Sequence, residues 1–322
     1  MSRASIWPGL EYLMLERPSV IEVVEVSARD GLQNEKMVFP TDSKIALIRH
    51  MVAAGAKRLE IASFVRADRV PQMADAEAVI AGLGDLPADI TTIGLVMNKR
   101  GALRALDTGI RQIGAVCVAS DSFAQRNQGQ TSLESLDVAN DIVRFARGEG
   151  RSAQVMIGAA FGCPFEGEVD PAHVVAMARR LAEAGPVEIG LADTIGVAVP
   201  HHVFELVTAV RAAIGDIPVR VHLHNTRNTG IANAWAAVQA GASTLDSALG
   251  GIGGCPFAPA ATGNIATEDL LYMLDRSHIR TGIDLSRTIE AAGWLESRME
   301  RPLPAMVSRA GPFPRPSSAT PL

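Results

Sequence analysis

Residues 187–224 read VEIGLADTIGVAVPHHVFELVTAVRAAIGDIPVRVHLH and contain one complete strand–helix–strand unit. The apolar run Val187–Leu191 is typical of a strand that is buried on both faces, and Pro200–Ile214 has apolar residues at helical spacing. A second buried run, Pro218–His222, follows directly. Two such strands joined through a helix predict a parallel pair, because a parallel connection needs a crossover of this length.

The same alternation recurs along the chain, eight times in all. The strand-like runs are Ser19–Ser27, Arg58–Ala62, Ile90–Val96, Gln112–Ala119, Gln154–Ala160, Val187–Leu191, Pro218–His222 and Thr244–Ala248. The helices that follow them are expected at Thr41–Ala54, Val70–Leu83, Lys99–Leu106, Leu133–Arg147, Pro171–Ala184, Pro200–Ile214, Thr229–Ala240 and Thr267–Leu274. Eight units in about 250 residues predict an α/β fold, namely a single-domain (β/α)8 TIM barrel. A doubly wound open sheet is the alternative, but the GxGxxG turn that such dinucleotide-binding folds carry after their first strand is absent.

The composition excludes several classes of protein. The chain has 322 residues, of which 48% are hydrophobic and 4% aromatic, and its formal net charge is −5. Without a long Lys/Arg run, neither nucleic acid nor a membrane surface is an expected partner. Cys117, Cys163 and Cys255 are too few and too scattered for a disulfide framework, which favours a cytoplasmic setting. The first residues also lack the continuous apolar core of a secretory signal.

The barrel is expected to span residues 19–300. Residues 1–18 are interpreted as a short N-terminal extension, and residues 301–322 as a proline-rich C-terminal tail that is extended or mobile. Barrels of this composition often form dimers, so a homodimer is an open expectation.

Catalytic residues of a TIM barrel lie where its strands end, and polar side chains occur at three such places. Arg29 and Asp30 follow the first strand, and His222 and His224 end the seventh. Because strand side chains alternate, both imidazoles face the same way and can bind one metal ion. The alternatives are a surface salt bridge for the Arg–Asp pair, and one structural plus one surface histidine for the other.

The third place is a glycine-rich segment after the eighth strand, with four glycines between Gly250 and Gly254. It is either a mobile loop or a lid over a ligand, in which case Cys255 is a reactive thiol. Asn264 follows it. A carboxylate, two imidazoles and an amide suit Mg²⁺ or Mn²⁺ better than zinc. Glu60 and Asp193 are either carboxylates that orient these ligands or members of structural ion pairs with Arg58 or Arg29.

Several motifs in order resemble those of the 3-hydroxy-3-methylglutaryl-CoA lyase family, which are metal-dependent TIM-barrel lyases. They are VEVSARDGLQNEK, LEIASFV followed by VPQM, FGCPFEG, LADTIGV, VHLHNT and GGIGGCPFAPAATGNIATEDLLYML. The resemblance extends from about residue 19 to 290.

The resemblance implies cleavage of a 3-hydroxyacyl-CoA to acetyl-CoA and a keto acid by a retro-Claisen (aldol-type) step. The implied ligands of a Mg²⁺ or Mn²⁺ ion are Asp30, His222, His224 and Asn264. Arg29 would stabilise the negative charge that develops on the thioester oxygen, and His222 and Cys255 would transfer protons. Glu60, Asp193 and Glu268 would orient ligands or take part in proton transfer.

The departures from the family pattern concern the acyl group. Gln154-Val155-Met156 stands where the family has Arg-Gly-Tyr, Gly190 replaces a serine, and Arg227 follows the histidine pair where the family has Tyr. The residues expected to contact substrate are Gln33, Ser63, Gln154, Met156 and Arg227.

The predicted substrate is 3-hydroxy-3-methylglutaryl-CoA or a close analogue, and the alternative is another acyl chain, such as citramalyl-CoA or a longer 3-hydroxy-3-alkylglutaryl-CoA. Two further alternatives are condensation of acetyl-CoA with a 2-keto acid and a metal-binding scaffold without activity. Retention of Arg29, Cys255 and Glu268 argues against the scaffold, because a scaffold needs none of them.

Overall fold

The computed structural model describes residues 18–254 and 263–314. Residues 1–17, which make up most of the predicted N-terminal extension, lie outside this part of the chain, as do Cys255 and residues 315–322. No helix within the described ranges is long and apolar enough to cross a membrane.

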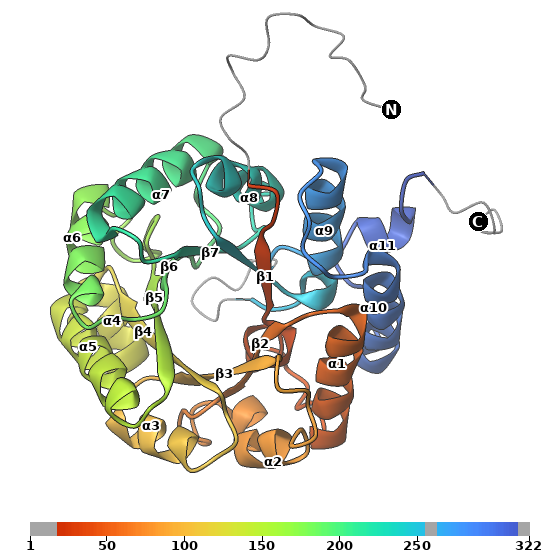
Figure 1. The fold of residues 1–322 in the computed structure, drawn as a ribbon, viewed down its shortest axis with the longest axis horizontal. Coiled ribbons are helices and arrows are strands. Elements are labelled where there is room, and N and C mark those ends of the chain that lie inside the picture. The colour runs from red at the N-terminus through yellow and green to blue at the C-terminus, as the bar shows by residue number, and fades with distance from the viewer. Residues whose placement is uncertain (1–17, 255–262, 315–322) are drawn as a thin grey trace, which may run out of the picture.

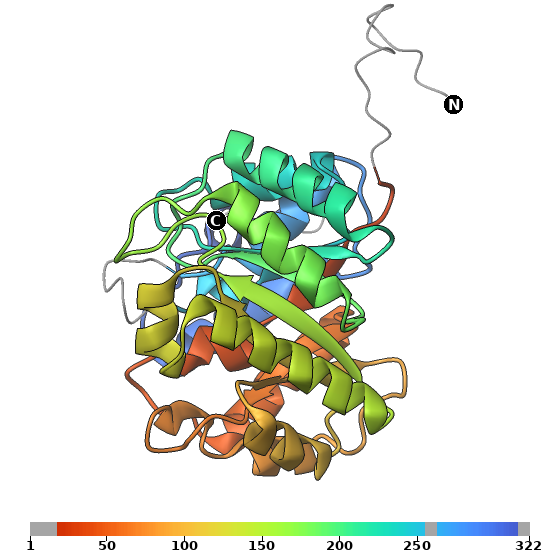
Figure 2. The ribbon, with the colours of Figure 1, turned by 90° about the vertical axis from the view of Figure 1, so that its left-hand side faces the viewer.

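Eight parallel strands form a closed barrel in sequence order, and β1 pairs with β8 to complete it. The strands are β1 (Glu22–Glu25), β2 (Arg58–Ser63), β3 (Thr91–Val96), β4 (Gln112–Val118), β5 (Ser152–Gly158), β6 (Ile189–Asp193), β7 (Val219–Leu223) and β8 (Thr244–Ser247). Figure 1 shows them at the centre of a ring of helices, and Figure 2 shows helices along the outer wall. The predicted TIM barrel is therefore confirmed.

The helices of the ring follow the predicted pattern with few exceptions. They are α1 (Thr41–Ala54), α2 (Ala76–Ala81), α3 (Lys99–Leu106), α5 (Ser132–Gly148), α6 (Pro171–Ala182), α7 (Pro200–Ile214), α8 (Gly230–Gln239) and α9 (Thr267–Arg276). The second helix is shorter than predicted, because Pro71–Met73 forms a separate 3-10 turn before it. Thr131 starts α5 with a capping box, and the Asp170 side chain caps α6.

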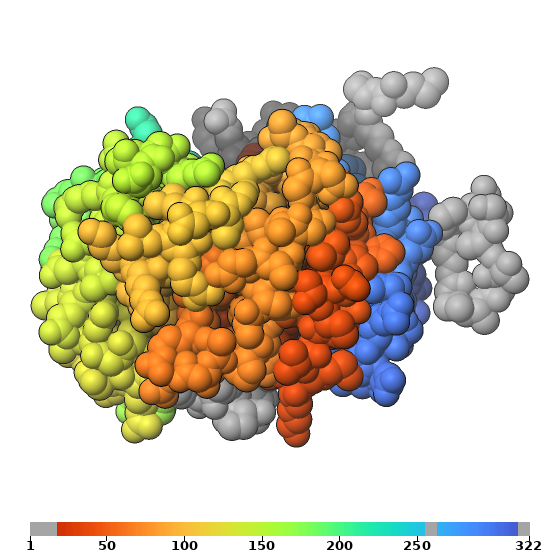
Figure 3. All heavy atoms as spheres, turned by 90° about the horizontal axis from the view of Figure 1, so that it is seen from below, coloured from red at the N-terminus to blue at the C-terminus, as the bar shows by residue number. Residues whose placement is uncertain are grey.

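Three helices were not expected from the sequence. The helix α4 (Asp121–Gln128) lies in the connection after β4, α10 (Leu285–Met299) follows α9, and α11 (Val307–Ala310) lies in the C-terminal tail. The helix α10 packs beside α1, where the rings of His50 and Trp294 are 4.7 Å apart. The helix α10 thus lies next to the first helix of the barrel (Figures 1 and 3).

The expectation of an extended or mobile tail is wrong for its first part. Leu303 and Ala305 are buried, and the N–H groups of Met306 and Val307 donate to the Asp269 carboxylate. This carboxylate satisfies amides at the start of α11, which otherwise lack partners within the helix. Residues 301–314 therefore pack against the barrel.

The interior of the barrel contains charged side chains where branched apolar residues usually predominate. Towards the amino ends of the strands, Arg58 donates to Gln112 and Glu188. One layer higher, the Arg220 guanidinium donates to the Asp246 carboxylate and lies 4.0 Å from Glu188. The charges alternate in sign, so each buried group has an opposite charge beside it.

Candidate metal centre

Three side chains from different parts of the chain meet at the carboxyl ends of the strands. Asp30 lies on a π-helical turn, Ser27–Gly31, that follows β1 directly, His222 lies on β7, and His224 follows that strand. The Asp30 Oδ2 atom is 3.8 Å from His222 Nε2 and 4.0 Å from His224 Nε2. One ligand atom from each residue lies within 4.8 Å of the other two, a spacing that one metal ion can bridge. The prediction that both imidazoles face the same way is confirmed.

The electrostatics of Asp30 and His224 favour the protonation states that bind a metal ion, whereas Asp246 and Asp30 raise the pKa of His222. Burial alone would raise the pKa of Asp30, but Arg29 and the two imidazoles hold that pKa well below its usual range. Burial, together with the charge of the neighbouring His222, lowers the pKa of His224 to about 4. The carboxylate is thus ionised and His224 is neutral at pH 7.

Asp246 on β8 is a site residue that the sequence analysis missed. Its Oδ2 atom is 3.0 Å from His222 Nδ1, and the same carboxylate accepts hydrogen bonds from Arg220. Burial opposes ionisation of Asp246, but Arg220 and His222 lower its pKa. Carboxylates commonly hold metal-binding histidines in this way, since the bond to Nδ1 orients the ring and leaves Nε2 for the ion. The only sequence signal was a carboxylate within an apolar strand.

Arg29 is held beside the cluster by two carboxylates. Its guanidinium donates to Asp30 Oδ1 at 2.6 Å and to Glu60 Oε2 at 2.8 Å, and its side chain is only 11% exposed. The alternative of a surface salt bridge is therefore wrong. Glu60 lies in the middle of β2, and its ion pair with Arg29 is the structural alternative that the sequence left open. The two carboxylates thus fix the positive charge of Arg29 at the mouth of the barrel.

Asn264 lies against Asp30. Its Nδ2 atom donates to Asp30 Oδ2 at 2.9 Å and to the carbonyl oxygen of Ile252 at 3.1 Å. Its Oδ1 atom is buried and has no hydrogen-bond partner within the described part of the chain. A buried amide oxygen beside a carboxylate and two imidazoles fits the donor set of a divalent cation. The residues present therefore fit the metal ion that the sequence pattern implies.

The remaining predicted catalytic carboxylates do not touch this cluster. Asp193 accepts hydrogen bonds from the backbone amides of Val197 and Ala198, so it holds the loop after β6. Glu268, at the start of α9, accepts from the Gly250 amide and from the Ser308 hydroxyl. Both hold backbone segments next to the site, and the charge of Asp193 also interacts with that of His222. Cys255 lies outside the described residues, and its predicted role stays a prediction.

The residues predicted to contact substrate lie in different environments. Ser63 Oγ, Gln33 Oε1 and Gln154 Oε1 are buried without a hydrogen-bond partner among the residues that the structure describes. Met156, on β5, is partly exposed. Arg227 donates to the carbonyl oxygens of Ile195 and Gly196, so it braces the loop after β6. Their contacts with substrate remain predictions.

Glu268 gives a prediction about stability. Burial raises its pKa to about 7 from an ordinary value of 4.5, so the folded state holds this proton more tightly than the unfolded state. The resulting stability is complete below about pH 4.5 and is lost as the pH rises through 7, which amounts to about 3 kcal/mol. We expect the stability advantage of the wild type over Glu268→Gln, measured by urea unfolding, to shrink from pH 5 to pH 8. Burial also raises the pKa of Glu25, but Glu25 is present in both proteins and so cancels in the comparison. If the stabilities of the wild type and Glu268→Gln change with pH in parallel, the assignment to Glu268 is wrong.

Comparison with known proteins identifies the family. Residues 20–294 match the model of the HMGL-like family. The chain belongs to the HMGL-like family. It is 45% identical over 311 residues to the (R)-citramalyl-CoA lyase of Chloroflexus aurantiacus, covering 94% of this chain and 98% of that protein. It is 38% identical to the mitochondrial hydroxymethylglutaryl-CoA lyase of Rattus norvegicus, covering 91% of this chain and 90% of that protein.

A solved structure agrees with these relatives. The HMG-CoA lyase of Acinetobacter baumannii in complex with coenzyme A and 3-methylmalate matches with a TM-score of 0.89 and 36% identity, covering 96% of this chain and all of that one. The HMGL-like chain is thus a carbon–carbon lyase, and its Asp30, His222 and His224 form a candidate metal site.

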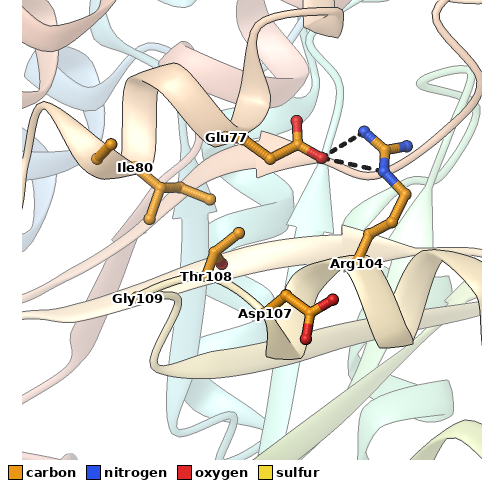
Figure 4. A pocket seen from close by; sticks show the side chains of 7 residues that line it. Glu77, Ile80, Arg104, Asp107, Thr108 and Gly109 are labelled. Carbon is orange, nitrogen blue, oxygen red and sulfur yellow. Dashed lines mark hydrogen bonds and ion pairs between the residues drawn. The ribbon is translucent and has the colours of Figure 1, made fainter.

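A separate hollow on the outer wall does not belong to this site. It has a volume of about 480 Å³, is lined by residues of α2, α3 and the loop after α3, and contains none of the three metal-site residues. Figure 4 shows the Arg104 guanidinium across this hollow, paired with Glu77. The positive charge of Arg104 in this hollow is therefore already neutralised by Glu77.

Proposed function

We propose that this chain is a divalent-metal-dependent lyase that cleaves citramalyl-CoA, or a 3-hydroxyacyl-CoA of similar size, to acetyl-CoA and a keto acid. The observation that carries the proposal is the cluster of Asp30, His222 and His224 beside the fixed cation Arg29. The higher identity to the citramalyl-CoA lyase favours this acyl chain over 3-hydroxy-3-methylglutaryl-CoA. Mg²⁺ or Mn²⁺ is the proposed ion, held by Asp30, His222, His224 and Asn264.

The residues of the site divide the reaction between them. A cation held by Asp30, His222, His224 and Asn264 would supply Lewis acidity at the oxygen on the carbon that becomes the ketone. As the C2–C3 bond breaks, its electron pair moves to C2 and the thioester oxygen, and Arg29 is placed to stabilise that charge. Breaking the bond requires removal of the hydroxyl proton, and release of acetyl-CoA requires a proton at C2.

The surroundings of His222 bear on which group delivers the proton at C2. Its Nδ1 atom forms a hydrogen bond with Asp246, and its Nε2 atom faces Asp30. With a cation bound at Nε2, neither ring nitrogen is free to carry a proton to the substrate. The roles of ligand and proton carrier therefore compete for one atom. We assign His222 to the cation and the proton transfer at C2 to Cys255.

An apolar wall at the barrel mouth supports a short acyl chain. In β3, β4 and β5 the fifth residue, Leu95, Val116 and Met156 respectively, is partly exposed while its neighbours are buried. Helices cover the outside of these strands, so this exposure is towards the mouth. Met156 is the register partner of Gly190 on β6, and a Cβ atom at Gly190 would lie 2.5 Å from the Met156 Sδ and Cε atoms. The thioether therefore occupies the space that the missing side chain leaves.

This wall offers no charge to the free carboxylate of the substrate. In 3-hydroxy-3-methylglutaryl-CoA the carboxylate is one methylene farther from the hydroxyl-bearing carbon than in citramalyl-CoA. A carboxylate at the shorter distance can stay beside the cation, with the methyl group against the wall. The longer acid would place its charge near apolar atoms, which is unfavourable without a polar partner.

The decisive assay measures acetyl-CoA release by the purified protein with Mg²⁺ or Mn²⁺. We expect kcat/KM for citramalyl-CoA to exceed that for 3-hydroxy-3-methylglutaryl-CoA by about 100-fold, because the longer acid lacks a partner for its carboxylate. In Met156→Ala, which opens the wall, this preference should narrow. A wild-type preference for the longer acid would contradict the proposed acyl chain, and release of acetyl-CoA from neither thioester would contradict the lyase itself.

A further inference from the structure

The glycine turn, residues 249–254, lies directly against the metal-binding residues. The Ile252 carbonyl accepts a hydrogen bond from Asn264 Nδ2. A Cβ atom at Gly253 would lie 2.6 Å from the same Nδ2 atom and 3.5 Å from the Asp30 carbonyl oxygen. Ile252 packs against Gly31, since a Cβ atom there would lie 2.7 Å from the Ile252 side chain. The position of this turn therefore limits where Asn264 and Asp30 can lie.

The opposite side of the turn is covered by residues 303–308, which we call the C-terminal strap. The Ala305 amide donates to the Gly250 carbonyl at 3.2 Å. Leu303 packs on Gly250, where a Cβ atom would lie 2.4 Å from its Cδ1 atom. Pro304 lies against Gly251, 3.5 Å from the corresponding position. The strap thus contacts the two glycines, with φ of 69° and 71°, that set the path of the turn.

Glu268 connects the strap to the turn a second time. One carboxylate oxygen accepts from the Gly250 amide at 2.9 Å, and the other accepts from the Ser308 hydroxyl at 2.7 Å. The amide and the carbonyl of Gly250 are therefore both bonded, one to Glu268 and one to Ala305. This carboxyl is fully buried, so loss of either partner is not readily replaced by water.

We propose that the C-terminal strap is a positioning element of the metal centre: it holds the glycine turn from behind and so fixes the ligand Asn264 and the backbone at Asp30. The residues act through the turn, since within the described ranges none of their side chains belongs to the cluster. This inference rests on the proposed metal site and goes beyond the proposed reaction. It assigns a role to a segment that the sequence marked only as a proline-rich tail.

The test compares Mn²⁺ binding by full-length Leu303→Ala, Ser308→Ala and the control Ser297→Ala, whose hydroxyl donates only within α10. Isothermal titration calorimetry without substrate gives the dissociation constant. Residues that hold metal ligands typically change affinity by 10–100-fold, so we expect about a tenfold weakening in L303A and roughly threefold in S308A. Excess Mn²⁺ should restore kcat in both variants, a rescue that simple loss of folded protein would not show.

The outcomes separate the two proposals. Thermal unfolding of the metal-free proteins identifies any loss of affinity that comes from global destabilisation, and S308A is the informative variant if L303A is poorly folded. Equal Mn²⁺ affinity in S308A, L303A and S297A would overturn the role of the strap. Failure of the wild type to bind Mn²⁺ would instead overturn the metal site on which the inference rests.

Discussion

Arg29→Ala should lower kcat by about 1,000-fold while leaving Mn²⁺ bound. Removing one group that stabilises a developing oxyanion typically costs 100- to 1,000-fold in rate, and Arg29 carries a full charge in a largely buried position. The ligand atoms of Asp30, His222 and His224 are unchanged, so affinity for the ion should stay within about threefold. Single-turnover acetyl-CoA release measures the first quantity, and calorimetric titration with Mn²⁺ measures the second.

Arg66→Ala is the matched control, because Arg66 is exposed and pairs only with the nearby surface residue Asp68 among the described residues. It should behave as the wild type does. If Arg29→Ala retains more than a tenth of the wild-type rate, Arg29 does not stabilise the transition state. If the wild type itself shows no turnover while binding Mn²⁺, the scaffold alternative replaces the lyase.

Asp30→Asn should weaken Mn²⁺ binding by at least about 100-fold and abolish turnover at ordinary metal concentrations. The change preserves shape but removes the negative charge that hard cations require, and loss of a direct ligand should exceed the effect typical of a supporting residue. It also leaves Arg29 with Glu60 as its remaining acidic hydrogen-bond partner among the described residues. Mn²⁺ titration followed by calorimetry is the measurement.

Asp68→Asn serves as its control, since it makes the same chemical change at an exposed ion pair. A normal dissociation constant in Asp30→Asn would show that the ion binds elsewhere. A normal constant in the control is required before the loss in Asp30→Asn is assigned to the site.

The local sequence pattern was sufficient for the barrel and for three of its site residues. Apolar runs at regular spacing predicted all eight strands, and the alternation of His222 and His224 placed both rings on one face. These signals are local, because each strand is buried on both faces and each side-chain direction follows from the strand itself. The proximity of Asp30 to the histidines followed from closure of the barrel. Closure brings β1 beside β8, which in turn pairs with β7.

The interactions that support the site could not be read in the same way. Asp246 meets His222 and Arg220 only through the register of β7 and β8, and its carboxylate gave no periodic signal. Likewise, Met156 and Gly190 were recognised as separate departures from the family pattern, and only the structure pairs them across β5 and β6. The tail was misjudged because its prolines suggest an extended chain, whereas Leu303 and Ala305 are buried in tertiary contacts.

The charged interior has a consequence for how this barrel can change. Charged side chains of opposite sign neutralise one another along the barrel interior, from the amino ends of the strands up to His222: Arg58, Glu188, Arg220 and Asp246. Removing one of them would leave a buried charge without its partner, which costs about 3–5 kcal/mol of stability. Substitutions in this column should therefore be tolerated only as compensating sets. Directed evolution of the acyl preference has more freedom at the apolar wall. There, a larger side chain at Gly190 can be compensated by a smaller one at Met156, and neither change removes a charge.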